Sequence, residues 1–230
     1  MALSQAQGGF RISSLRSKSS LIYLLLALPL IAVLIFVTVQ PVLVLPRIRL
    51  APGYALVNQD GARVSQDHFL GQIVIYNVAY THCQDECAES WTLMASMQRE
   101  LAQIETEFPV TLVTISVDPN DTPETLSRFA ADYGIDLERW HLLTGDPEHL
   151  KYVVGAGFNT YYTYDSNGNL YLEPSVALVD GVGILRAVHR SLPSAATLVR
   201  DMDLLLVEAR NSTGLTRYAY EAAHLFLCYP

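Results

Sequence analysis

Residues 73–87 read Ile-Val-Ile-Tyr-Asn-Val-Ala-Tyr-Thr-His-Cys-Gln-Asp-Glu-Cys, and this stretch decides the fold. Its first seven residues form an apolar run that is typical of a strand buried on both faces of a sheet. Two cysteines, Cys83 and Cys87, follow directly. From Trp91 to Phe108 apolar residues then recur at steps of three and four, which is the period of an amphipathic helix. The sequence therefore predicts a buried strand, a turn that carries two thiols, and a helix.

The order of elements around this stretch predicts an α/β domain. Upstream, Asp60-Gly61 marks the turn of a small hairpin. Downstream, Thr122 and Pro123 open a helix that stops at Gly134. The other predicted elements are strands over 110–117, near 141–143, over 176–179 and over 184–189, a hairpin over 161–172, and helices over 146–154, 194–209 and 216–227. This is the order of a thioredoxin-like domain.

A long uncharged segment near the N-terminus predicts a membrane anchor. Residues 19–46 carry no charge, and residues 21–39 are almost wholly apolar. At about 1.5 Å of rise per residue the apolar part spans roughly 28 Å, close to the hydrocarbon thickness of a bilayer. We expect an uncleaved transmembrane helix that contacts lipid. Because Arg11, Arg16 and Lys18 precede it, the positive-inside rule places the N-terminus in the cytoplasm and the domain on the extracytoplasmic side.

Length and charge limit the organisation and the partners. The chain has 230 residues, which suits one domain with appendages. We divide it into a cytoplasmic tail (1–18), the anchor and start of the tether (19–46), a thioredoxin-like domain (50–209) and a C-terminal helical extension (210–230). The net charge of −8 argues against a nucleic-acid partner, which would require a basic face.

Cys83 and Cys87 are the main candidates for chemistry. At the start of a helix, free N–H groups and the helix dipole favour a thiolate, whereas Asp85 and Glu86 oppose it, so we expect no strongly acidic thiol. The spacing puts both thiols on one face of a helical turn, where they can share a soft cation such as Cu(I) or form a disulfide. In an oxidising compartment the third cysteine, Cys228, is left over.

Three blocks of the chain resemble the Sco/SenC family of copper proteins. Residues 80–87 (Tyr-Thr-His-Cys-Gln-Asp-Glu-Cys) are similar to the family's copper-site signature. Residues 115–124 (Ile-Ser-Val-Asp-Pro-Asn-Asp-Thr-Pro-Glu) and 140–145 (Trp-His-Leu-Leu-Thr-Gly) are similar to its second and third blocks. The likeness covers roughly residues 54–190. It implies a thioredoxin-like fold, membrane anchoring, copper binding through Cys83 and Cys87, and assistance to the copper-carrying subunit of a respiratory oxidase.

The chain departs from the family pattern around the expected copper site. Gln84 and Ala88 replace two prolines next to the thiols. The third copper ligand of the family, a histidine shortly before a later strand, is absent, because residues 171–175 read Tyr-Leu-Glu-Pro-Ser. Glu173 is a candidate replacement, although a carboxylate is a hard ligand that suits Cu(I) poorly. Pro174 resembles the cis-proline that many thioredoxin-like redox proteins place beside their active cysteines.

Three histidine or cysteine positions remain as weaker candidate ligands. His82 matches a residue type that the family often shows there without using it as a ligand. His224 and Cys228 lie four residues apart in the last predicted helix and so share a face. They are candidate metal ligands, and Cys228 is also a candidate resolving thiol. Alternatively, this helix packs on the domain and the cysteine acts as a small apolar residue.

Three functions fit these features. The leading hypothesis is a membrane-anchored, Sco-like metallochaperone that prefers Cu(I) and assists copper-centre assembly in a respiratory oxidase. The missing histidine favours a second hypothesis, a thiol–disulfide reductase that uses Cys83 and Cys87 as a redox pair. It would need no copper and would act on an oxidase subunit or another exported cysteine protein. The third hypothesis is an accessory subunit of a respiratory membrane complex.

Overall fold

The computed structural model describes residues 13–39, 42–166 and 169–226. The chain divides into two compact units, residues 1–42 and 43–230. The first unit holds helix α1 (Ser13–Val39), which begins within the predicted tail. Its part Ser20–Val39 is long and apolar enough to cross a membrane, and none of it is buried. By length and composition this helix fits the predicted anchor.

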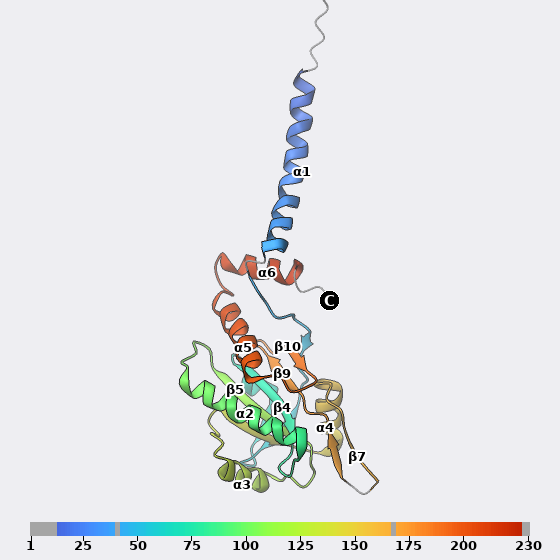
Figure 1. The fold of residues 1–230 in the computed structure, drawn as a ribbon, viewed down its shortest axis with the longest axis vertical. Coiled ribbons are helices and arrows are strands. Elements are labelled where there is room, and N and C mark those ends of the chain that lie inside the picture. The colour runs from blue at the N-terminus through green and yellow to red at the C-terminus, as the bar shows by residue number, and fades with distance from the viewer. Residues whose placement is uncertain (1–12, 40–41, 167–168, 227–230) are drawn as a thin grey trace, which may run out of the picture. The chain divides into compact units, whose positions relative to one another are not determined.

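The second unit is built on a mixed eight-stranded sheet with the strand order β1-β10-β9-β4-β5-β6-β2-β3 (Figure 1). The neighbours β4, β5 and β6 run parallel, and every other neighbouring pair is antiparallel. A separate hairpin consists of β7 (Tyr162–Tyr164) and β8 (Leu170–Leu172). The strands of the large sheet are β1 (Arg49–Leu50), β2 (Ala55–Asn58), β3 (Arg63–Ser65), β4 (Ile73–Ala79), β5 (Val110–Ser116), β6 (Trp140–Thr144), β9 (Val176–Val179) and β10 (Ile184–His189).

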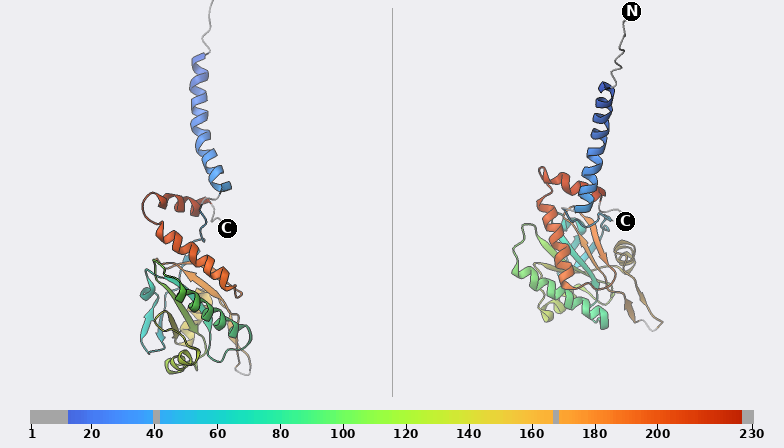
Figure 2. Two further views of the ribbon diagram at one scale, coloured as in Figure 1. Left: turned by 60° about the vertical axis from the view of Figure 1, so that its left-hand side comes forward. Right: turned by 45° about the horizontal axis from the view of Figure 1, so that its top comes forward.

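Helices cover both faces of this sheet, as a doubly buried central strand requires. On β4, Asn77 faces one side, where its amide approaches the Ser90 hydroxyl of α2 (Asp85–Gln103). Its neighbour Tyr76 faces the other side, where its ring contacts Phe158, the residue that follows the π-helix η2 (Lys151–Gly157). Figure 2 shows further views of these layers. The remaining helices are η1 (Gln66–Phe69), α3 (Pro123–Tyr133), α4 (Pro147–Leu150), α5 (Ala195–Arg210) and α6 (Thr216–Phe226).

The predicted α/β order is confirmed, and its local causes are visible. All seven residues of β4 and all seven of β5 are buried, as the apolar runs indicate. The Thr122 hydroxyl accepts a hydrogen bond from the Thr125 amide at the start of α3, and Pro123 holds the first helical position. The helix ends at Gly134, whose φ of +65° is a left-handed conformation that glycine adopts without steric cost.

Four details differ from the sequence expectations. Helix α2 ends at Gln103, so the three- and four-residue period that continues to Phe108 outlasts the helix. The helix predicted over 146–154 is a short α-helix that continues as a π-helix. Strand β1 was not predicted. Among the described residues no peptide bond is cis, so Pro174, whose isomer the sequence leaves open, does not share the cis form of the prolines that it resembles.

Candidate thiol and metal site

The cysteine pair lies where the central strand β4 gives way to helix α2. Strand β4 ends at Ala79, and Gln84 is the N-cap residue of the helix. Cys87 lies in the first helical turn and is buried, whereas Cys83 precedes the helix and is half-buried. A disulfide joins them, with the two Cα atoms 5.4 Å apart. The predicted proximity of the two thiols is therefore confirmed.

A buried carboxylate holds the loop that leads to Cys83. Asp121 is 1% exposed. Its Oδ2 accepts hydrogen bonds from the Thr81 amide (2.9 Å) and the Ser116 hydroxyl, and its Oδ1 accepts one from the Thr81 hydroxyl. A carboxylate buried in this way needs several donors, because an unpaired buried charge is very costly. The hydrogen bonds of Asp121 thus join two segments that are far apart in sequence, residues 80–87 and 115–124.

His82 is oriented by this same carboxylate. The Thr81 hydroxyl donates to Asp121, so its oxygen accepts the hydrogen bond from Nδ1 of His82, 3.0 Å away. The hydrogen-bond network therefore assigns a proton to Nδ1 of His82. The imidazole is exposed to solvent.

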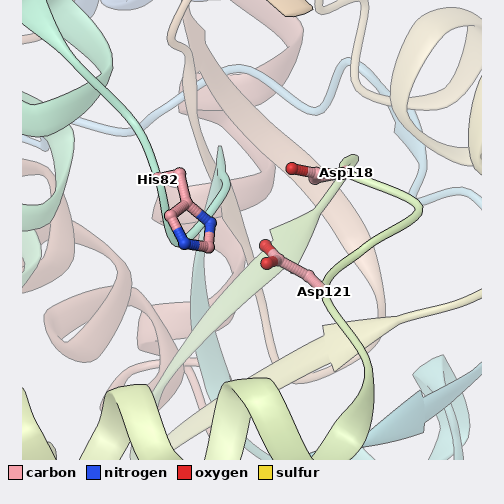
Figure 3. A group of neighbouring side chains, drawn as sticks. All are labelled: His82, Asp118 and Asp121. Atoms are coloured by element: carbon pink, nitrogen blue, oxygen red, sulfur yellow. The ribbon is translucent and has the colours of Figure 1, made fainter.

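His82, Asp118 and Asp121 form a compact polar group beside the thiols. One potential ligand atom from each lies within 4.8 Å of the others. Figure 3 shows one ring nitrogen of His82 turned toward the two carboxylates and the other turned away. Asp121 accepts three hydrogen bonds, and Oδ1 of Asp118 accepts two from Asn120. The group therefore supports the loop.

A cavity of about 640 Å³ opens in front of the buried thiol of Cys87. Its walls come from the loop before α2, the loop after β5, and the β7–β8 hairpin. Two hydrogen bonds fasten this hairpin, from the Tyr164 hydroxyl to the Val117 carbonyl (2.9 Å) and from the Tyr80 hydroxyl to the Leu170 carbonyl (3.3 Å). The lining residues are Tyr80, His82, Gln84, Cys87, Asp118, Asn120, Tyr164, Asn169, Leu170, Tyr171 and Leu172.

The phenols of Tyr162 and Tyr164 in the hairpin stay neutral at physiological pH. Burial, followed by the negative charge of Asp118, raises the pKa of Tyr164. Burial, with smaller contributions from Tyr164 and Glu148, raises the pKa of Tyr162 to about 12. A neutral phenol donates a hydrogen bond but is a poor metal ligand. These tyrosines therefore hold the hairpin and do not add anionic ligands to the cavity.

Residues 171–175, where the histidine of the family pattern is absent, differ in whether their side chains line the cavity. Leu172 is buried and lines the cavity. Glu173, the candidate replacement ligand, is exposed and is not part of the lining, and its amide donates to the Tyr161 carbonyl. Leu172 is therefore the buried residue of this stretch that lines the cavity to which Cys87 also contributes.

His224 lies at the other end of the central strand. Cys83 follows the C-terminal end of β4, whereas Val74 at its N-terminal end pairs with Val179, next to Asp180. His224 belongs to a polar network that includes Asp180, and its Nε2 lies 2.8 Å from Glu208. The structure therefore does not bring His224 to the cysteine pair. Cys228 lies outside the described residues.

The role of Asp121 was missed by sequence reasoning, and the sequence did not distinguish Leu172 from Glu173 as the residue that faces the site. Asp121 was noted as part of a family block but was given no role. The signal that could have found it is its place just after a buried strand that is parallel to β4, since the carboxyl ends of parallel strands meet at one sheet edge. Leu172 gives no comparable signal, because the pairing of the hairpin decides which side chain faces inward.

Comparisons with known proteins match this architecture. The family model described as SCO1/SenC matches residues 45–203. A protein of Bacillus subtilis (strain 168) called SCO1 protein homolog is 32% identical over 93 residues, which are 40% of this chain and 47% of that protein. A protein of Stutzerimonas stutzeri whose name describes it as copper-binding is 31% identical over 162 residues, 65% of this chain and 74% of that protein.

A solved structure shares the fold. The structure of BsSco, described as a member of the Sco family of cytochrome c oxidase assembly proteins with a disulfide switch, has a TM-score of 0.62 and 22% identity. The match covers 72% of this chain and 98% of that one. The chain spans less than half the length of the Bacillus subtilis relative named above. Because the family model matches well over half of the chain, from the tether into α5, the chain belongs to the SCO1/SenC family.

Proposed function

We propose that this protein binds copper as cargo through Cys83 and Cys87 and assists copper-centre assembly in a respiratory oxidase. The observation that carries the proposal is the pairing of two thiols at the start of α2, one just before the helix and one in its first turn, beside a cavity. Related proteins support it, since one relative is named for copper binding and BsSco is described as a cytochrome c oxidase assembly protein.

The residues present suit Cu(I) better than Cu(II). Two thiolates are soft ligands and hold Cu(I) with few other donors, whereas Cu(II) prefers a tetragonal set that includes nitrogen. Among the described residues that line the cavity, His82 is the one histidine, and Leu172 offers no donor. We infer that Cu(II) binds weakly, or through a ligand from another molecule. Glu173 remains a candidate ligand beside the cysteine pair, because it is adjacent in the chain to Leu172 of the cavity wall. His224 and Cys228 remain candidates only for a metal held away from this pair.

The disulfide controls access of copper to the site. Reduction of the Cys83–Cys87 bond takes up two electrons and two protons and yields two thiols. Cu(I) then displaces the thiol protons, because the thiolate is the metal-binding form. A dithiol reductant must therefore act before copper loading. The reduced pair can also exchange with a disulfide of a partner protein, which leaves Cys83 and Cys87 oxidised and the partner reduced. This exchange supports the second candidate function, a thiol–disulfide reductase for exported cysteine proteins.

The location follows from the apolar helix α1. We propose that residues 21–39 contact membrane lipid, with the N-terminus in the cytoplasm and the domain (50–209) on the extracytoplasmic side. The partner would be the copper-carrying subunit of the oxidase. The uncharged helix of bilayer length supports the anchor, and the basic residues before it support the orientation.

Anaerobic Cu(I) titration of the full chain in detergent tests the proposal. The reduced protein should bind one Cu(I) per chain, whereas the oxidised protein should bind none at this site, because the disulfide leaves no thiolate to bind the metal. Copper binding that is equal in both redox states would contradict it. Reduction of a disulfide-bonded peptide by the copper-free dithiol, with no Cu(I) binding, would instead support the reductase.

A second experiment tests at which position of the hairpin an added histidine can supply the nitrogen ligand that the chain lacks. Leu172→His should strengthen Cu(II) binding at least about tenfold, the lower end of what one interaction at a metal site contributes. Electron paramagnetic resonance should show new nitrogen coupling. Glu173→His is the matched control and should change little, because Glu173 is exposed outside the cavity. A tight wild-type Cu(II) complex with nitrogen and sulfur ligands would contradict the idea, and His82→Ala would then test His82 as its source.

A further inference from the structure

Helix α6 presents an apolar face to solvent. Leu215 just before it and Leu225 near its end are 87% and 68% exposed, and Tyr218 is 64% exposed. Phe226 is 42% exposed. Contiguous apolar surface of this kind is uncommon on soluble proteins and marks an interaction site.

The exposed apolar residues form one stripe, opposite the face that packs on the domain. At 100° per residue, Leu215, Tyr218, Leu225 and Phe226 fall within an arc of about 100°. The packed side carries the buried Tyr220 and Ala223. A surface helix normally shows one apolar stripe, toward the core. Helix α6 has a second one, and nothing among the described residues covers it.

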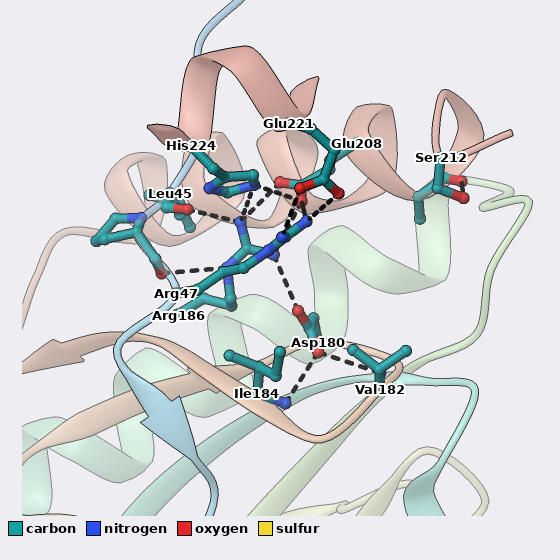
Figure 4. A network of polar contacts seen from close by, with 12 residues as sticks. Leu45, Arg47, Asp180, Val182, Ile184, Arg186, Glu208, Ser212, Glu221 and His224 are labelled. Carbon is teal, nitrogen blue, oxygen red and sulfur yellow. Dashed lines mark hydrogen bonds and ion pairs between the residues drawn. The ribbon is translucent and has the colours of Figure 1, made fainter. Parts of the chain in front are cut away.

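A polar network fixes α6 to the start of the domain (Figure 4). The Arg186 guanidinium is 2% exposed and bonds Glu208 at the end of α5 (2.7 Å) and the Leu45 carbonyl (2.6 Å). His224 of α6 bonds the same Glu208 (2.8 Å). Arg47 makes a two-pronged ion pair with Glu221 of α6, at 3.1 Å for each contact. Helix α6 is therefore held directly against residues 45–47.

The chain between this docking point and the apolar helix is short. Val39 is the last residue of α1, and six peptide steps lead from it to Leu45. Six residues span at most about 22 Å when fully extended. If residues 21–39 are inserted in a bilayer, this limit keeps α6 near the membrane surface. The flanking groups suit that place, since Tyr and Arg are typical of the interface, and Arg217 lies 5.5 Å over the Tyr218 ring.

We propose that α6 lies on the membrane in which the chain is anchored, with Leu215, Tyr218, Leu225 and Phe226 inserted among the lipid headgroups and upper acyl chains. The occupant of the stripe is thus the lipid surface. The family match ends at residue 203, so this contact belongs to the C-terminal extension of this chain. The proposal rests on the proposed membrane anchor but is independent of copper binding.

Quenching of tryptophan by brominated lipid tests the proposal on the full chain. The protein is reconstituted into vesicles of phosphatidylcholine with a minority of phosphatidylglycerol, with ordinary or brominated acyl chains. Tyr218→Trp should lose at least about half of its added emission in brominated lipid, because an interfacial helix buries its apolar face about 5–10 Å into the boundary. The native Trp91 and Trp140 are buried in the core and give a constant background.

Two further variants make every outcome decisive. Tyr133→Trp on α3 is the matched control, since Tyr133 is 65% exposed, and it should not be quenched. Tyr23→Trp in the apolar helix reports insertion and should be quenched. Quenching of Tyr23→Trp without Tyr218→Trp would overturn the proposal and keep the anchor, and quenching of neither would overturn both. Shielding of Tyr218→Trp from acrylamide without bromine quenching would mean that protein covers the stripe, which also overturns it.

Discussion

Cys83→Ser and Cys87→Ser should each weaken Cu(I) binding at least about 100-fold. Loss of an interaction behind the ligands of a metal site typically lowers affinity 10–100-fold, and a thiolate lost from the metal itself should cost no less. The hydroxyl of serine is a hard donor and does not replace a soft thiolate. Cu(I) competition titration of the anaerobic, reduced full chain measures the effect.

The third cysteine supplies the control for this experiment. Cys228→Ser keeps both Cys83 and Cys87 at the start of α2 and should bind Cu(I) as the wild type does. Full binding by the Cys83→Ser/Cys87→Ser double variant would mean that copper is held elsewhere, and His224 with Cys228 would be the first residues to test. Loss of binding in the Cys228→Ser variant alone would also contradict the assignment.

Arg186→Met should lower the free energy of unfolding by about 3–5 kcal/mol, because removal of one partner from a buried ion pair leaves the other charge uncompensated. Arg186 is 2% exposed, and it pairs with Asp180 at 2.9 Å and with Glu208 at 2.7 Å. It also donates to the carbonyls of Leu45 and Pro46. Urea unfolding followed by the fluorescence of the core tryptophans measures the change.

An exposed ion pair in the same domain provides the comparison. Arg210 and Glu107 lie 2.9 Å apart, but their side chains are 61% and 57% exposed. Such surface pairs contribute about 0–1 kcal/mol, so Arg210→Met should change the unfolding free energy by no more than that. Equal effects of the two substitutions would show that burial of Arg186 does not set its contribution.

The pKa of Glu208 depends on the same polar network, through Arg186 and His224. Burial alone would raise it, but the hydrogen bonds and charges of Arg186 and His224 outweigh burial and lower it. A carboxyl whose pKa is lowered by folding stabilises the protein above its unfolded value of about 4.5 and loses that contribution as the pH falls through the folded value. The network is therefore intact at neutral pH and weakens in acid.

Much of the fold was predictable because its signals are local. The apolar runs of β4 and β5 need no tertiary information, and neither does the cap at Thr122 nor the stop at Gly134. Features that depend on distant partners were not predictable. Strand β1 has two residues and exists because β10 lies beside it. A buried Arg186 on a strand has no sequence signature, since its partners come from three other segments.

The candidate site was predictable in its chemistry and less so in its geometry. The spacing of Cys83 and Cys87 predicts their proximity, because residues four apart on a helical turn share a face. Which side chain of residues 171–175 is buried at the cavity wall depends on how β8 pairs with β7, because a shift by one residue turns the opposite side chains inward. Hence Glu173 was a reasonable candidate from composition, but the hairpin points it to solvent.

The short outermost strands also bear on how copies of this protein coexist. The sheet ends in β1 at one edge and β3 at the other, with two and three residues. A long exposed edge strand is a template for joining sheets between molecules, whereas very short edge strands with charged side chains resist it, and Arg49 and Arg63 are both exposed here. Neighbouring copies of this protein can thus collide repeatedly without aggregating edge to edge.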